Sequence, residues 1–280
     1  MTLPDWTVRM GALNLTPDNQ ILIHEITPLG VVSKASDSDR DGASGSWQGT
    51  DFAASRTITI RGTIISGAQT PRFIARYLMG KWNSIGVSGD QLLEIKLPGF
   101  PELQTVGRCR NNASYNARDW GRSAIPFTLQ FDDRRGYLVT TTVWSAEGAT
   151  SGGTDGAAWP WEWPVSFGAT SSKVLSIWNA GDFATPATIR FSGPAVNPRV
   201  TNPATGEYAG IAGTIAAGDW VEIDPDSATI LDSSGASRMT DLLTGSTWLY
   251  MPRGATTLIY TAGGGTTGSV LVSGRTPYAL

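Results

Sequence analysis

The sequence is poor in the residue types on which catalysis and nucleic-acid binding depend. It has one cysteine (Cys109), one histidine (His24), 16% charged residues and a formal net charge of -3. One cysteine excludes a disulfide within the chain and a thiolate metal cage. A charge so near zero, with no run of Lys or Arg, argues against a protein that grips nucleic acid through many phosphate contacts.

Long apolar runs are also absent. No segment approaches the roughly 18 consecutive apolar residues of a transmembrane helix, so the sequence predicts no membrane insertion. Residues 1–15 have Pro, Asp and Asn among their apolar residues and lack the apolar stretch of a signal peptide. We therefore expect a protein that is made and assembled in a cytoplasm.

Glycine and short β-prone runs are abundant instead, with 33 Gly among 280 residues. Between Trp159 and Tyr260 one pattern repeats: a β-prone run, then a turn of Gly, Pro, Asn or Asp. Strands of about five residues joined by such turns are typical of an antiparallel β-sandwich. The clearest runs are 163–167, 174–178, 188–192, 197–200, 215–224 and 248–254.

The first half of the chain mixes strands with one helix. Ile58, Ile60 and Ile64 recur with the period of a strand, as do the apolar residues of 93–97 and 127–131. Between them Thr70 and Pro71 favour a helix start, and Ile74, Tyr77, Leu78, Trp82 and Ile85 recur at helical spacing, which predicts a helix at about 70–85. This half is expected to be a small α+β sheet with the helix across one face.

The chain therefore divides into two β-rich domains. Residues 146–158 contain Ala, Ser, Glu, Gly, Thr and Asp and nothing large and apolar, which is the composition of a linker. The predicted domains are 1–145, mainly β with one helix, and 159–280, an antiparallel β-sandwich. The predicted fold class of the whole chain is mainly β.

The side chains that could carry chemistry favour a protein that is not an enzyme. His24 lies in an alternating, strand-like run, and Cys109 has no nucleophile context. Asp132-Asp133 and Asp224-Pro225-Asp226 stand at strand ends, where Asp commonly caps a turn. No glycine-rich phosphate loop follows a strand. The sequence predicts no catalytic residue, no bound cofactor and no metal ligand.

Two local motifs leave alternatives open. Asp37, Asp39 and Asp41 before Gly42 match the opening of an EF-hand calcium loop, but position 12 is Gln48, so a solvated acidic loop is the other interpretation. Trp159, Trp161 and Trp163 alternate, so they share one face of a strand. Three indoles on one face predict either a buried core or subunit interface, or a stacking platform for sugars.

The order of the turn motifs resembles the distal tail proteins of long-tailed phages with non-contractile tails, the siphovirus-type tail components also called minor tail proteins. In that family the C-terminal domain opens with an aromatic-Pro-Val-x-Phe strand, as at 163–167, and continues with an Asn-x-Gly-Asn/Asp turn, as at 179–182. The later motifs are Gly193-Pro194, Asn197-Pro198, Gly218-Asp219 with Asp224, and Trp248 with Pro252 and Gly254. The family often has Asn two residues after that last Gly, where Thr256 stands here.

This resemblance implies a structural virion protein of the phage tail tip, assembled in the host cytoplasm. It implies an N-terminal ring-forming domain, a galectin-like C-terminal sandwich, and a hexameric ring of the protein with itself. The ring would join the tail tube protein to the tip or baseplate hub, or to a tail-associated lysin-like protein, and leave a channel for DNA and the tape-measure protein. The alternative is a carbohydrate-binding or receptor-binding module that uses the sandwich.

Overall fold

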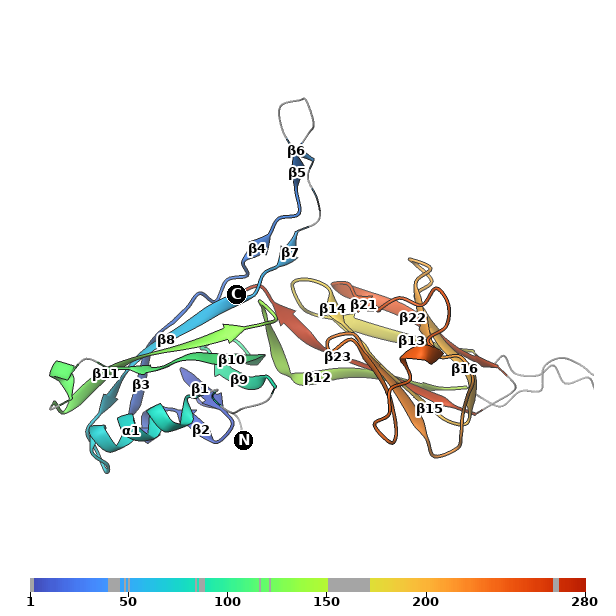
Figure 1. Ribbon diagram of the computed structural model, residues 1–280. Helices are drawn as coiled ribbons and strands as arrows, with labels where there is room; N and C mark the ends of the chain where they lie inside the picture. The colour runs from blue at the N-terminus through green and yellow to red at the C-terminus, as the bar shows by residue number, and fades with distance from the viewer. Residues whose placement is uncertain are drawn as a thin grey trace, which may run out of the picture. The chain divides into compact units, whose positions relative to one another are not determined.

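The structure is a computed structural model in which the chain forms two compact units. It describes residues 3–39, 46–47, 49, 51–83, 85, 89–115, 117–120, 122–150, 172–263 and 267–280. Unit 1 comprises Met1–Thr141 together with Pro277–Leu280, and unit 2 comprises Thr142–Thr276. Both units consist mainly of antiparallel strands, which confirms the predicted fold class (Figure 1).

Unit 1 is one antiparallel sheet with a helix across it. Its strands follow the order β2-β1-β9-β10-β11-β8-β3, and the start of β12 also pairs with β10. Its elements are β1 (Thr7–Met10), β2 (Leu13–Leu15), η1 (Pro17–Asn19), β3 (Ile21–Thr27), β4 (Ser33–Lys34), β5 (Ser38–Asp39), β6 (Ser46–Trp47), β7 (Phe52–Ala53), β8 (Arg56–Ile65), α1 (Pro71–Lys81), β9 (Gln91–Lys96), β10 (Glu102–Ser114), η2 (Ala117–Asp119), β11 (Ala124–Asp133) and β12 (Leu138–Ala149).

The core of unit 1 lies between the sheet and α1. Ile58, Ile60 and Ile64 of β8 are fully buried, as their alternation predicts. Trp82, the residue after α1, meets Phe131 of β11 edge to face, with ring centroids 6.3 Å apart. Aromatic pairs of this geometry stabilise a core beyond the area they bury.

The helix is shorter than predicted, and part of its predicted apolar stripe is exposed. It ends at Lys81, and the side chain of Thr70 makes no capping hydrogen bond. Tyr77 is 44% exposed and Ile85 is 80% exposed. Tyr77 lies roughly 100° around the helix from the buried Leu78, and Ile85 lies beyond the helix end.

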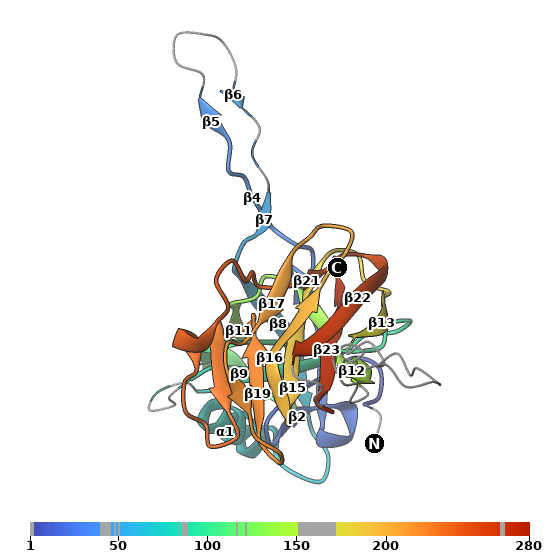
Figure 2. The ribbon, with the colours of Figure 1, turned by 90° about the vertical axis from the view of Figure 1, so that its right-hand side faces the viewer.

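Residues 31–54, here called the arm, leave the sheet between β3 and β8. Within the arm β4 pairs with β7, and β5 pairs with β6, as two short antiparallel ladders. Figures 1 and 2 both show the arm extending away from α1 and from the rest of unit 1. The sequence predicts a loop here, either calcium-binding or solvated and acidic, and no strands.

Unit 2 is a sandwich of two antiparallel sheets. One has the order β13-β22-β16-β17, with β18 on β16, and the other has the order β12-β23-β15-β19-β20. Its elements are β13 (Ser172–Asn179), β14 (Thr185–Pro186), β15 (Thr188–Ser192), β16 (Ala195–Thr201), β17 (Tyr208–Gly210), β18 (Thr214–Ile215), β19 (Trp220–Asp224), β20 (Thr229–Asp232), η3 (Met239–Asp241), β21 (Tyr250–Met251), β22 (Gly254–Gly263) and β23 (Ser269–Tyr278).

The two sheets of unit 2 meet in an apolar core. Phe191 of β15 stacks on Tyr260 of β22, with ring centroids 6.0 Å apart, and both side chains are fully buried. Gly218 and Gly254 start the strands β19 and β22 from a positive φ, of 91° and 92°, which side chains with a Cβ rarely adopt. The positive φ explains why this sequence has Gly at these two turns.

The structure divides the chain after Thr141 rather than after Ser145. Residues 146–149 of the predicted linker continue β12, and residues 151–158 lie outside the described residues. At the other end, Pro277–Leu280 return to unit 1 rather than remaining in the sandwich. Two paired strands, β12 and β23, therefore connect the units, because the chain crosses between them twice.

Candidate assembly surfaces

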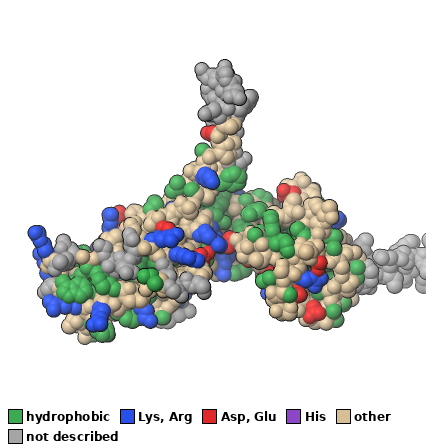
Figure 3. Space-filling view, in the orientation of Figure 1, with side chains coloured by type: hydrophobic (Ala, Val, Ile, Leu, Met, Phe, Trp, Pro, Cys, Tyr) green, Lys and Arg blue, Asp and Glu red, His purple; other side chains and the backbone are tan. Residues whose placement is uncertain are grey.

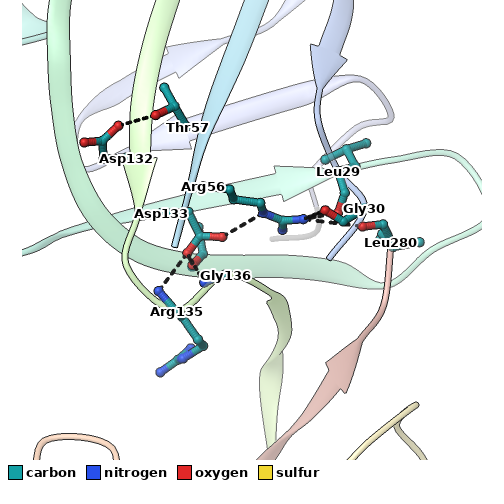
Figure 4. Close-up of polar contacts among 10 residues, drawn as sticks. Leu29, Gly30, Arg56, Thr57, Asp132, Asp133, Arg135, Gly136 and Leu280 are labelled. Atoms are coloured by element: carbon teal, nitrogen blue, oxygen red, sulfur yellow. Dashed lines mark hydrogen bonds and ion pairs between the residues drawn. The ribbon is translucent and has the colours of Figure 1, made fainter. Parts of the chain in front are cut away.

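One buried side chain clamps the base of the arm. Arg56 follows the arm at the start of β8, and its side chain is 1% exposed. Its Nη1 donates to the carbonyl oxygens of Leu29 and of Gly30, the latter at 2.7 Å, and these residues precede the arm (Figure 4). It also donates to the carbonyl oxygen of Leu280 at 3.4 Å. Arg56 thus joins both ends of the arm to the returning segment.

Asp133, the last residue of β11, neutralises Arg56. Its fully buried carboxylate accepts from Arg56 Nε at 3.0 Å. It also accepts from the Thr105 hydroxyl and from the backbone N–H groups of Arg135 and Gly136, at 3.0 and 3.1 Å. These further hydrogen bonds satisfy the Asp133 carboxylate, which makes a buried ion pair tolerable, whereas Arg56 Nη2 is buried without a hydrogen-bond partner among the described residues. The clamp is therefore shielded from solvent and salt.

Asp132 and Asp133 do not form a catalytic pair, because neighbours on a strand point to opposite faces. Asp132 is 34% exposed and accepts from Thr57 Oγ1 at 2.6 Å and from Arg110 Nε. Burial alone would raise the pKa of Asp132, but these two donors together lower it below its usual value. A lowered pKa keeps this carboxylate ionised at neutral pH.

The described part of the arm is held by two short ladders and a few exposed polar contacts. Its described polar contacts include Ser33 Oγ to Asp51 at 2.9 Å and the Gly49 N–H to Asp37 at 3.0 Å. Phe52 is 61% exposed and Val32 is 44% exposed. A two-stranded ribbon is marginally stable alone in water, and its open edges offer unpaired backbone groups. These are the properties of an element that docks on a partner.

The outward face of α1 is aromatic and basic. Phe73 is 58% exposed and Tyr77 is 44% exposed, while Arg72, Arg76 and Lys81 are also exposed. The helix contains no Asp or Glu. Figure 3 shows hydrophobic side chains gathered over α1 with Lys and Arg side chains around them. An apolar patch rimmed by charges of one sign is typical of a binding surface.

A groove of about 490 Å³ lies beside these aromatic side chains. Its walls include Phe73 and Tyr77 of α1, Leu13 of β2, and Ile21 of β3. Gln20 holds one end together by donating from Nε2 to the carbonyl oxygen of Ile65 at 2.9 Å. The groove is large enough for an aromatic side chain.

The single histidine is a surface residue of a strand, as the sequence favours. His24 lies at an irregularity of β3, and its Nε2 is 2.8 Å from Thr63 Oγ1.

Cys109 is 2% exposed, and burial raises the pKa of its thiol to about 12. Asp224 caps a turn as predicted, because its Oδ1 accepts from the Asp226 N–H at 3.0 Å.

The described residues do not decide between the alternatives for the Asp37–Asp41 motif or for the three Trp residues at 159–163. Asp37 is exposed, only the backbone of Asp39 is described, and Asp41 lies outside the described residues. Among the side chains that the structure does describe, no three of His, Cys, Asp or Glu converge to hold a metal ion. Trp159, Trp161 and Trp163 all lie outside the described residues. No described helix has the length and apolar character needed to cross a membrane.

The structure exposes a different indole, on the outer face of unit 2. Trp178 of β13 is 66% exposed, and Val174 on the same face is 59% exposed. Further along this sheet Arg199 stacks on Tyr208, with the guanidinium carbon 5.1 Å from the ring centroid. Because side chains alternate between the two faces of a strand, an inward-facing Ile177 in the sequence implies an outward-facing Trp178.

Comparison with known proteins assigns the sandwich to a family. Residues 180–271, most of unit 2, match the family model described as "Siphovirus-type tail component, C-terminal domain". The chain carries a siphovirus-type tail component domain. The matched span contains the motifs from Gly193-Pro194 to Gly254. It confirms the resemblance to distal tail proteins that these motifs indicated. No curated protein sequence matches the chain significantly.

Solved tail structures share the fold over both units. SPP1 Dit (gp 19.1), described as a paradigm of the hub adsorption apparatus in phages that infect Gram-positive bacteria, matches with a TM-score of 0.64 and 14% identity, covering 97% of this chain and 99% of that chain. The phage P2 baseplate in its activated conformation with Ca matches with a TM-score of 0.53 and 10% identity, covering 95% and 97%. The same baseplate with Sr matches with a TM-score of 0.52 and 9% identity, covering 96% and 97%.

Proposed function

We propose that this protein is a non-catalytic structural component of the distal end of a phage tail. Six copies form a ring that joins the tail tube to the tip or baseplate hub and leaves a channel for DNA and the tape-measure protein. The observation that carries the proposal is the likeness to SPP1 Dit, which covers 97% of this chain with both units in order. The hub, or a tail-associated lysin-like protein, and the tube protein are its expected neighbours in the virion.

Unit 1 has the surfaces that ring closure requires. A closed ring of identical copies uses head-to-tail contacts, so each copy needs two different interfaces. The arm and the outward face of α1 are two such surfaces, and they differ in chemistry. The formal charge of -3 suits a conduit through which DNA passes without being held.

Light scattering of the purified protein, with electron micrographs of the same sample, tests the ring. The expected mass is about 178 kDa, six times the 29.7 kDa of one chain, with closed rings in the micrographs. The measurement is repeated with the cognate tail tube protein added, since a tube end can template the ring. A protein that remains monomeric in both conditions would contradict the proposal.

Sugar binding by unit 2 is a second candidate function, favoured by the exposed indole of Trp178. Exposed Trp rings stack on the apolar faces of sugars. The test is binding to host cell-wall polysaccharide by the wild type and by Trp178→Ala, with Leu231→Ala as a matched control at a partly exposed apolar residue of unit 2. Loss of binding in Trp178→Ala alone would support this candidate, and absence of binding by the wild type would exclude it.

A further inference from the structure

The outward face of α1 is positively charged and borders a groove whose walls are partly apolar and partly polar. Arg72, Arg76 and Lys81 give the helix a charge of +3 with no carboxylate on it. Lys81 Nζ lies 5.9 Å from the Tyr77 ring centroid, so the cation borders the aromatic surface. Of the described residues that line the groove, only Asp18 is acidic. The partner of this face should present an apolar side chain flanked by carboxylates.

The arm has that chemistry. Its sequence, residues 31–54, contains four Asp against Lys34 and Arg40, a net charge of -2. Of the four, Asp37 and Asp51 are described and exposed. Phe52 stands next to Asp51 and is 61% exposed, which makes it one of the more exposed aromatic side chains of unit 1.

The arm cannot contact the outward face of α1 in its own chain. Arg56 clamps the base of the arm to Leu29 and Gly30, and Figures 1 and 2 both show the arm leading away from α1. A contact between the two must therefore come from another copy. Such a contact is heterologous, which is the kind that closes a ring.

We propose that the arm of one copy docks on the α1 face of the next, with Phe52 in the groove between Phe73 and Leu13 and with Asp37 and Asp51 toward Arg76 and Lys81. This inference rests on the proposed ring and names its contact. This contact would explain why both the arm and the α1 face expose apolar side chains. The exposed apolar residues of the arm and of α1 are buried together, and the charges at their edges fix the register.

Disulfide trapping between two variants tests the contact directly. Phe52→Cys and Tyr77→Cys are made in separate chains, which are mixed, allowed to assemble and oxidised. A disulfide forms only when the two Cα atoms lie within about 4.4–6.8 Å, and mixing ensures that the Phe52→Cys to Tyr77→Cys bond joins two copies. Native Cys109 contributes no background because it is 2% exposed. Phe52→Cys mixed with Trp178→Cys, a site in unit 2 that is 66% exposed, is the matched control.

The expected result is a covalent dimer in the first mixture and not in the control mixture. Equal cross-linking in both mixtures, or none in the first, would overturn the proposed contact. Cross-linking of either single variant with itself is measured separately and subtracted.

Charge reversal tests the proposed ion pairs between the arm and α1 in the assembled protein. Arg76→Glu with Lys81→Glu should weaken ring assembly about tenfold or more, measured as the concentration at which rings dissociate. Adding Asp37→Lys and Asp51→Lys in the same chain should restore it. Arg253→Glu, at an exposed cation of unit 2, should leave assembly unchanged. Rings that are unaffected by the first reversal, or not restored by the second, would refute the pairing.

The outcomes separate this inference from the proposed function. A wild-type protein that forms rings while the trapping and reversal tests fail would retain the tail-ring function and lose the arm-to-helix contact. A wild-type protein that forms no ring, even with tube protein, would remove both.

Discussion

The buried pair of Arg56 and Asp133 should be the most sensitive polar site in unit 1. Arg56→Ala leaves the carboxylate of Asp133 charged, fully buried and without its counter-ion. Breaking one partner of a buried pair typically costs about 3–5 kcal/mol. For a unit of this size that loss lowers the melting temperature by about 10 °C or more. Calorimetry or circular dichroism of the thermal transition measures it.

A control on the same strand separates burial from charge. Arg61 of β8 also pairs with a carboxylate, Glu25, at 2.9 Å, but the two side chains are 58% and 42% exposed. Exposed pairs contribute about 0–1 kcal/mol, so Arg61→Ala should hardly change the transition. If Arg56→Ala costs no more than Arg61→Ala, the reasoning about the clamp is wrong.

The double variant distinguishes stability from positioning. Replacing a buried pair with apolar residues of similar volume is often neutral or stabilising, so Arg56→Met with Asp133→Leu should recover part of the lost stability. The recovery is partial because the N–H groups of Arg135 and Gly136 lose their acceptor. The double variant cannot recover the hydrogen bonds from Arg56 to Leu29 and Gly30. The arm of this variant should therefore be cut faster by protease than that of the wild type, at a temperature well below the melting transition of both proteins. Unchanged cleavage would show that Arg56 does not hold the arm.

Three further predictions concern single residues. Tyr278→Ala should cost unit 1 about 2 kcal/mol, measured by thermal melting, because its ring packs edge to face on Phe100 at 6.3 Å. Cys109 should not react with a thiol reagent at pH 8 until denaturant is added, since with a pKa of about 12 roughly one thiol in ten thousand is ionised there; rapid labelling of the native protein would contradict its burial. Gly254→Ala should lower the free energy of unfolding by about 1 kcal/mol, because Gly254 has a φ of 92° that alanine rarely adopts. Gly80→Ala should raise it by about 0.5–1 kcal/mol, because Gly80 lies in α1 with open space around its Cβ position. Changes of the opposite sign in thermal melting would refute the backbone argument.

Local patterns predicted the parts of the fold whose signal is local. The alternation of Ile58, Ile60 and Ile64 correctly identified a strand and its buried face. The helical spacing was only partly informative, because an exposed apolar residue such as Tyr77 repeats like a buried one. Periodicity reports that a side chain is apolar, and it does not report what covers it.

The clamp could not be predicted because its members are distant in the sequence. Arg56 and Asp133 are 77 positions apart, and Arg56 and Leu280 are 224 apart. An Arg at the start of a β-branched strand carries no mark of burial. The arm was missed for another reason: its strands are two residues long, too short for alternation to appear, and its acidic composition is that of a loop.

Because the chain leaves unit 1 after Thr141 and re-enters it at Pro277, unit 2 is a domain inserted into unit 1 rather than one appended to it. The strands that lead out and back, β12 and β23, are hydrogen-bonded neighbours, so the two points of insertion lie close together. A different module could occupy that position without disturbing the surfaces of unit 1 that we assign to the ring. A protease that cuts one connection would leave the two units covalently joined through the other.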